Sequence, residues 1–151
     1  MKLTRRETMS FSAGAIALMI AGARTAPAMA GAGETDAAVM AFSGGAQPEA
    51  GVITLKAPEI AENGNTVPVS VSVDSPMTKD DYVESVAIFA EGNPNPEVVT
   101  FNFTPRSGEA AATTRMRLAK TQNVVAVAKT STGKVYIDKR EVKVTIGGCG
   151  G

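Results

Sequence analysis

Histidine and tryptophan are absent from the 151 residues, and cysteine occurs once, at Cys149. Histidine is the commonest general base and the commonest metal ligand, so its absence removes the usual parts of an acid–base site and of a metal centre. Without a group of histidines and cysteines there is no zinc motif. A single cysteine also cannot form a disulfide within the chain. We therefore expect no metal, no cofactor and no catalytic residue in this protein.

The first 30 residues have the features of an export signal. The paired arginines Arg5 and Arg6 precede an uncharged run at 11–23, and Ala28-Met29-Ala30 has the small-x-small pattern of a cleavage site. The run is shorter than the ~20 apolar residues that a membrane-spanning helix needs. Paired arginines at this place are typical of twin-arginine signals. We expect residues 1–30 to be a twin-arginine-type signal peptide, removed on export to the periplasm, and we expect no membrane anchor.

The chain that remains after cleavage is mildly acidic. Cleavage after Ala30 takes four basic residues and one acidic residue from fifteen of each, which leaves 11 basic and 14 acidic side chains and a net charge of −3. This balance argues against nucleic acid as a partner. The length of 151 residues predicts one domain, since a domain usually takes roughly 100–200 residues.

Residues 31–146 have the pattern of an all-β domain that follows a short leader. In the leader, residues 34–42 favour one or two helical turns, which Gly44-Gly45 ends. Beyond residue 52, apolar and polar residues alternate with a period of two in several segments, as in strands with one buried face. These segments are 67–73, 99–103, 115–118 and 142–146. With the turn signals between them, they predict an immunoglobulin-like antiparallel β-sandwich of about seven strands.

Two features of the pattern need a separate explanation. Three segments are apolar throughout and are predicted to be central strands: 52–57, 82–90 and 123–129. In the last part of the domain, Val135 and Ile137 are out of phase with Val142 and Val144. A bulge or bend near 138–140 would correct that phase.

The chain ends in one cysteine among four glycines, Gly147, Gly148, Gly150 and Gly151. Glycine permits almost any backbone dihedral and adds no side-chain bulk. Three extended residues carry Cys149 about 10 Å from Ile146, at ~3.3–3.6 Å each. We expect residues 147–151 to be a glycine-rich swinging arm that carries Cys149 into a narrow cleft on another protein.

The alternative interpretation is a flexible terminus whose cysteine has no function, because glycine-rich ends are common. A leftover cysteine in an exported protein nevertheless indicates pairing or a reactive thiol. Cys149 has no histidine and no adjacent cation to promote its thiolate. The thiol is therefore expected to act as a carrier that the site receiving the arm must activate.

Three other groups of residues were weighed against simpler explanations. Asp80, Asp81 and Glu84 suggest a cation site, but a solvated loop is the better explanation. The loop at 92–96 (GNPNP) is either a docking surface or, more simply, a turn. A third group is basic and forms either a charged face or ordinary outward positions of strands: Arg115, Arg117, Lys120, Arg140 and Lys143.

Four stretches together resemble the SoxY family, the sulfur-carrier subunits of the bacterial thiosulfate-oxidising complex. They are 58–69 (PEIAENGNTVPV), 89–96 (FAEGNPNP), 120–123 (KTQN) and the terminal GGCGG. The resemblance implies an immunoglobulin-like fold and a stable heterodimer with a SoxZ-like companion. It also implies that Cys149 covalently holds cysteine-S-thiosulfonate and cysteine persulfide, and that a haem cytochrome, a sulfate-releasing hydrolase and a sulfane dehydrogenase dock transiently. The other function that stays open is a periplasmic redox or adhesion module in which Cys149 makes an intermolecular disulfide.

Overall fold

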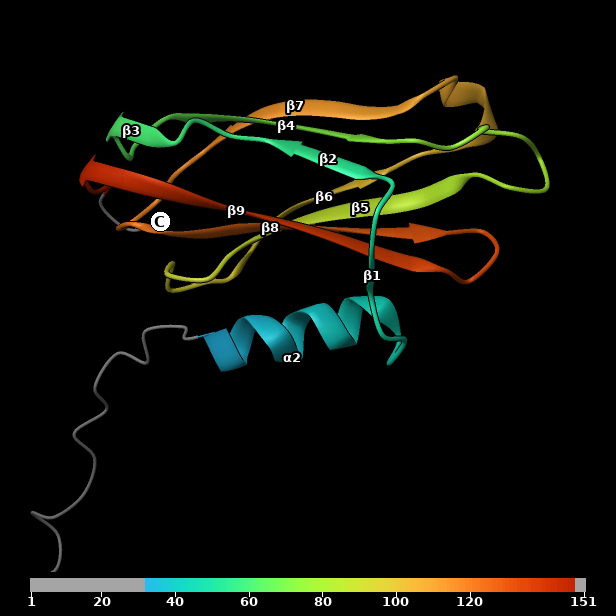
Figure 1. The fold of residues 1–151 in the computed structure, drawn as a ribbon, viewed down its shortest axis with the longest axis horizontal. Coiled ribbons are helices and arrows are strands. Elements are labelled where there is room, and N and C mark those ends of the chain that lie inside the picture. The colour runs from blue at the N-terminus through green and yellow to red at the C-terminus, as the bar shows by residue number, and fades with distance from the viewer. Residues whose placement is uncertain (1–31, 149–151) are drawn as a thin grey trace, which may run out of the picture.

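A computed structural model of the chain describes residues 32–148, which form one helix, nine strands and one short 3-10 turn (Figure 1). The helix is α2 (Ala32–Ser43) and the turn is η1 (Pro105–Ser107). The strands are β1 (Glu49–Ala50), β2 (Ile53–Lys56), β3 (Ile60–Asn63), β4 (Val67–Val73), β5 (Val83–Ala90), β6 (Glu97–Asn102), β7 (Ala110–Met116), β8 (Gln122–Thr130) and β9 (Val135–Ile146). The expected signal peptide and the residues Cys149, Gly150 and Gly151 lie outside the described residues.

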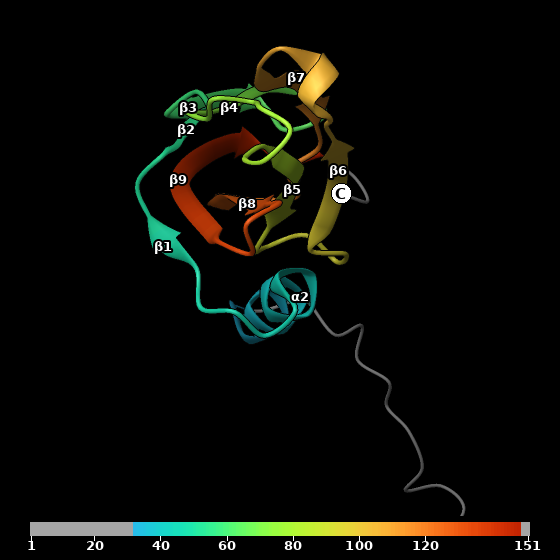
Figure 2. The same cartoon turned by 90° about the vertical axis from the view of Figure 1, so that its right-hand side faces the viewer.

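Two sheets face each other, and α2 covers the outer face of the larger one (Figures 1 and 2). The larger sheet has six strands in the order β1-β9-β8-β5-β6, with β3 also paired to β9, and the smaller sheet has the order β2-β4-β7. The predicted two-sheet β-sandwich is confirmed. The structure has nine strands, where about seven were predicted, because the short β1 and β3 each pair in parallel with the long β9. The remaining pairs are antiparallel.

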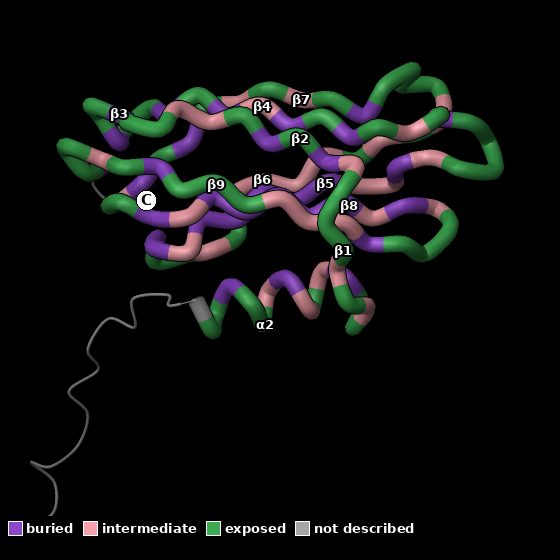
Figure 3. Tube along the Cα trace, viewed as in Figure 1, coloured by how far each residue is buried: buried purple, intermediate pink, exposed green. Residues whose placement is uncertain are grey.

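Strands β5 and β8 are buried on both faces, since the larger sheet lies between the smaller sheet and α2. On β5, Val86 and Ile88 belong to the core between the sheets, whereas Phe89 packs beneath the helix. There the ring of Phe42 meets that of Phe89 edge to face, with 6.2 Å between centroids. Figure 3 shows the buried residues concentrated along these inner strands. The prediction of central strands at 82–90 and 123–129 is confirmed.

For residues 52–57 the same prediction is wrong. Strand β2 lies at the edge of the smaller sheet and pairs only with β4. Its burial alternates, with Ile53 and Leu55 facing inward and Thr54 and Lys56 exposed. An apolar composition therefore did not distinguish an edge strand with one buried face from a central strand.

Of the bulge or bend predicted near 138–140, the bulge is wrong. Strand β9 pairs with β8 without any register shift between Gln122↔Val142 and Lys129↔Val135. The change of phase has another cause, because successive residues of a strand point to opposite faces of the sheet. Val135 packs in the cluster beneath α2, and Val142 packs in the core between the sheets. One regular strand thus contributes to two cores.

The predicted helical turns at 34–42 are confirmed, and the helix is longer than expected, with 12 residues. It ends where Gly44 and Gly45 adopt positive φ angles of 67° and 86°. Their N–H groups donate to the carbonyls of Ala41 and Met40, the pattern of a Schellman cap. Within the described residues, no helix combines the length and the apolar character needed to cross a membrane.

Candidate functional site

The two glycines that lead to Cys149 are held against one end of the sandwich. Beyond β9, the N–H of Gly148 donates to the carbonyl of Leu118 at 2.9 Å. The N–H of Leu118 donates to the carbonyl of Gly64 at 2.8 Å, and the N–H of Gly64 donates to that of Ile146 at 2.7 Å. The bonds join three segments that are distant in the sequence. We call this group, which consists of Gly64, Leu118, Ala119, Gly147 and Gly148, the arm root.

Glycine is required in the arm root because the backbones approach so closely. A Cβ on Gly147 would lie 2.1 Å from the carbonyl oxygen of Ala119, and one on Gly148 would lie 2.7 Å from that of Gly64. A Cβ on Gly64 would lie 2.3 Å from the carbonyl oxygen of Leu118. None of the three glycines has a positive φ angle. Space, rather than an unusual dihedral, therefore demands glycine here.

This arrangement corrects the expectation that the chain is free to bend from Ile146 onward. Gly148 is buried, and both Gly147 and Gly148 pack against the backbone of other segments. Valine at these two positions would collide with the backbone of Ala119 and Gly64. The swinging arm itself stays a prediction, since Cys149, Gly150 and Gly151 lie outside the described part of the chain.

A pair of buried side-chain amides holds the segment on which the arm root rests. Asn93 is 2% exposed and Gln122 is 7% exposed. The Nδ2 of Asn93 donates to the carbonyl of Arg117 at 2.8 Å, and its Oδ1 accepts from the N–H of Ala119 at 3.0 Å. The Nε2 of Gln122 donates to Oδ1 of Asn93 at 2.9 Å and to the carbonyl of Lys120 at 3.0 Å. The pair thus connects the loop after β5 with residues 117–120.

An ion pair lies beside these amides. The carboxylate of Glu91 accepts hydrogen bonds from Nζ of Lys139 and from Nδ2 of Asn123. Burial alone would raise the pKa of Glu91, but the bonds from Lys139 and Asn123 and the charge of Lys139 outweigh it, so the pKa is lowered. The carboxylate therefore stays ionised and fixes β9 to the loop that contains Asn93.

The sequence did not identify Gly64 or Gln122 as functional candidates. Asn93 was considered only as part of the loop at 92–96, for which a docking surface and a simple turn were the two interpretations. The available signal was that the stretches 58–69, 89–96 and 120–123 carried the family resemblance together. The structure brings one residue from each stretch to the end of the sandwich where the chain leads to Cys149.

The family model described as "Sulfur oxidation protein SoxY" matches residues 39–149 of the chain. The chain belongs to the SoxY family. The matched residues include the whole arm root, both buried amides and Cys149.

A solved structure agrees with this assignment. The sulfur carrier protein SoxY from Chlorobium limicola f thiosulfatophilum is 42% identical, with a TM-score of 0.63, over 76% of this chain and 99% of that one. Two superoxide reductases share the fold alone. The one from Ignicoccus hospitalis is 20% identical, with a TM-score of 0.56, over 77% of this chain and 94% of its own. The putative one from Thermotoga maritima is 19% identical, with a TM-score of 0.54, over 68% and 89%. Among curated protein sequences, none matches.

Elsewhere on this SoxY-family chain, the acidic and basic candidate groups consist mainly of exposed side chains. Asp80 and Asp81 are exposed, and the N–H of Asp81 donates to Oγ1 of Thr78 to close a turn. Within residues 32–148 no three carboxylates gather as ligands for a metal. The basic side chains considered as a charged face are all exposed: Arg115, Arg117, Lys120, Arg140 and Lys143.

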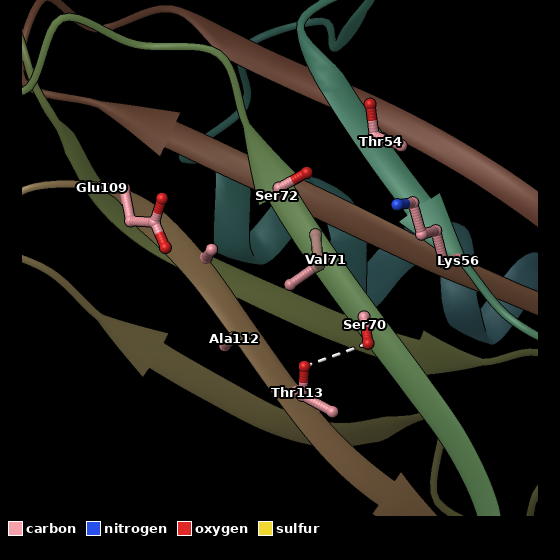
Figure 4. Close-up of a pocket in the computed structure, with 9 residues that line it drawn as sticks. Thr54, Lys56, Ser70, Val71, Ser72, Glu109, Ala112 and Thr113 are labelled. Carbon is pink, nitrogen blue, oxygen red and sulfur yellow. Dashed lines mark hydrogen bonds between the residues drawn. The ribbon is translucent and has the colours of Figure 1, made fainter.

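A hollow on the outer face of the smaller sheet also lacks the parts of a chemical site (Figure 4). It is lined by residues of β2, β4 and β7 and by Glu109. Its internal hydrogen bond joins the hydroxyls of Ser70 and Thr113 at 3.0 Å. Lys56 on β2 and Glu109 just before β7 border it, and Figure 4 shows no hydrogen bond between them. No acid–base pair or nucleophile with a base is present among these residues.

Proposed function

We propose that this chain carries sulfur intermediates covalently on Cys149 during thiosulfate oxidation in the periplasm and presents them to partner enzymes. The observation that carries the proposal is the family match, which runs through the arm root to Cys149. The structure supports it, because Gly148 is held at the end of the sandwich and Cys149 follows one peptide bond later. The residue that precedes the only thiol of the sequence is therefore held at a defined place in the fold.

The proposed chemistry uses the thiol as a point of attachment. The sulfur of Cys149 forms a bond to the sulfane sulfur of thiosulfate, the thiol proton is released, and the two electrons pass one at a time to a haem cytochrome. A hydrolase then adds water to the terminal sulfonate sulfur and cleaves its bond to the sulfane sulfur. Sulfate leaves, and the persulfide stays on Cys149 for a sulfane dehydrogenase.

We assign the catalytic steps to the partners and only the carriage to this chain. The arm root is held together by backbone groups and is supported by the amides of Asn93 and Gln122, which are neither acids nor bases at neutral pH. The sequence contains no histidine that would promote the thiolate of Cys149. A thiol that only its partners activate suits a carrier, because it reacts slowly with oxidants outside the partner sites.

The test is the intact mass of the mature protein after incubation with thiosulfate and periplasmic extract. We expect adducts whose masses match a thiosulfonate and a persulfide, and their complete absence in Cys149→Ser. Thermal unfolding of this variant should match that of the wild type. If the wild type yields only disulfide-linked dimers or glutathione-type adducts, the redox or adhesion module is the correct function and the carrier proposal is wrong.

We also propose that residues 1–30 direct export by the twin-arginine route. The paired arginines, the uncharged run and Ala28-Met29-Ala30 support this assignment. N-terminal sequencing of periplasmic protein should begin at Gly31. Replacement of Arg5 and Arg6 by lysine should retain the precursor in the cytoplasm. A chain that is uncleaved and cytoplasmic in the wild type would contradict the proposal.

A SoxZ-like companion subunit is the third part of the proposal. Strand β6 forms one edge of the larger sheet, and Val98, Val99 and Phe101 on it are only half-buried. An exposed apolar edge strand invites pairing with another chain, so proteins usually cover it. Purification from native extract should yield a second small β-protein in equal amount. A strictly monomeric mature chain would refute this part of the proposal.

A further inference from the structure

We propose that Asn93 is a positioning residue, which fixes the place where the carrier arm leaves the sandwich. The inference rests on the proposed function, because it assigns a purpose to the attachment point of Cys149. Asn93 bonds to the residues on both sides of Leu118, namely Arg117 and Ala119. Leu118 in turn is the residue whose carbonyl accepts from Gly148. The amide therefore orients the acceptor that holds the arm.

The environment of Asn93 makes this orientation rigid. The side chain is 2% exposed, and both of its polar atoms are bonded to the protein. Its Oδ1 accepts a second bond from Gln122, whose Oε1 accepts from the N–H of Gly92 at 2.7 Å. A buried network in which every polar atom has a partner allows one arrangement and resists others. Residues 117–120 are thus a fixed support for Gly147 and Gly148.

The fixed support shortens the free part of the arm. With Gly148 held, the free part of the arm begins after Gly148, and each trans peptide adds at most about 3.8 Å between consecutive Cα atoms. The sequence alone suggested about 10 Å of reach from Ile146. A partner that takes up Cys149 must then approach this end of the sandwich closely. Next to the arm root in the sequence, Asn65 and Lys120 are exposed at this end.

Asn95 provides a matched control for Asn93. Both belong to the same loop, but Asn95 is exposed and makes none of the bonds to residues 117–120. We compare Asn93→Ala and Asn95→Ala in the mature protein with its natural companion. A second test variant, Gly147→Ala, places a Cβ against Ala119 and opens the arm root from the other side. It lies beyond β9, so the sandwich can fold without the contact.

The first measurement is hydrogen exchange of the Gly148 amide by NMR. We expect exchange to be at least about tenfold faster in Asn93→Ala and Gly147→Ala than in the wild type and Asn95→Ala, because the bond to Leu118 is lost. Exchange of central β5 amides should stay unchanged, which shows that the fold persists. This measurement needs no sulfur chemistry, so it tests the arm root even if the proposed function fails. Equal exchange in all four proteins would refute the inference.

The second measurement compares a partner-dependent reaction with a partner-independent one. Loading of Cys149 from thiosulfate in periplasmic extract should slow about tenfold or more in Asn93→Ala and Gly147→Ala, since misplaced reacting groups lose rate steeply. Alkylation by iodoacetamide, which needs no docking, should proceed at the wild-type rate. If the wild type is loaded and both variants are loaded at the wild-type rate, the positioning role is wrong and the proposed function still holds. A wild type that never loads would overturn the proposed function.

Discussion

The two ends of the sandwich use glycine for different physical reasons. At the end that contains η1 and the turn between β8 and β9, on the right of Figure 1, Gly108 and Gly133 have φ angles of 78° and 82°. A Cβ there would meet no atom within 4 Å. At the arm end, Gly64 has no positive φ angle, yet a Cβ on it would lie 2.3 Å from a backbone oxygen.

Glycine at the first end allows a turn to reverse the chain. Glycine at the arm end allows segments that are distant in the sequence to pack against each other. Gly133 is needed for a local dihedral, which its neighbours in the sequence determine. Gly64 is needed for contact with Leu118 and Gly148, which are distant in the sequence. A turn reveals nothing about function, whereas close packing next to the only cysteine does.

Alanine at Gly64 should have the largest effect on stability and should also impair loading of Cys149. Its Cβ collides with backbone atoms of Leu118 and Gly148, and overpacking of this kind costs about 1–3 kcal/mol. Alanine at Gly133 has free space and should cost about 1–2 kcal/mol through its left-handed backbone alone. Denaturant unfolding measures both costs. Loading from thiosulfate should slow only in Gly64→Ala, and equal slowing in both variants would contradict the comparison.

Valine at both Gly147 and Gly148 should open the arm root with a smaller loss of stability. The terminal segment can move outward, so the main loss is the hydrogen bond from Gly148 to Leu118, about 1 kcal/mol. Loading in extract should fall sharply, because the attachment point is no longer fixed and the tail is wider. Thermal unfolding and the loading rate are measured together. Loading at the wild-type rate would show that neither a fixed root nor a narrow arm matters.

The ion pair of Glu91 should contribute less, about 1 kcal/mol or below, since Lys139 is half-exposed. The lowered pKa means that its stabilisation is fully present above the ordinary value of 4.5. It is lost as the pH falls through the lowered value in the folded protein. The stability difference between wild type and Glu91→Gln should therefore shrink below pH 4.5. A stability difference that stays constant as the pH falls below 4.5 would contradict the stabilising role of this ion pair.

The smallest expected effect concerns the reactivity of Cys149, which the folded domain should leave close to that of a short peptide. The alkylation rate of reduced protein by iodoacetamide should rise with pH through the midpoint of a glycine-flanked peptide. The reason is that the sequence places no histidine and no adjacent cation beside Cys149. A midpoint well below neutrality would show that this end of the sandwich activates the thiol itself, and the assignment of activation to the partners would be wrong.

The strands were predictable where one face alone is buried. The alternation of Val67, Val69, Val71 and Val73 matches the buried face of β4. The same reasoning failed for β9, because its two halves bury opposite faces against different layers. The packing of α2 over the sheet belongs to the tertiary structure, and the local sequence of β9 does not predict it.

The thiol was identifiable from the sequence, but its support was not. Cys149 is the only cysteine and has glycines on both sides, which is visible without a structure. The amide of Asn93 looks like an ordinary turn residue in a loop of glycine and proline. Its importance comes from Arg117 and Ala119, more than twenty residues away. Only the fold brings these groups together.

The most direct test of the account is a time course on the C-terminal tryptic peptide, which begins at Val144 after cleavage at Lys143 and contains Cys149. The mature protein is incubated with thiosulfate and periplasmic extract, and the peptide mass is followed in the wild type and in Asn93→Ala. We predict a thiosulfonate adduct first and a persulfide later, both on Cys149, with slower formation in the variant. A peptide that stays unmodified, or that carries only glutathione or a second copy of itself, would contradict the account.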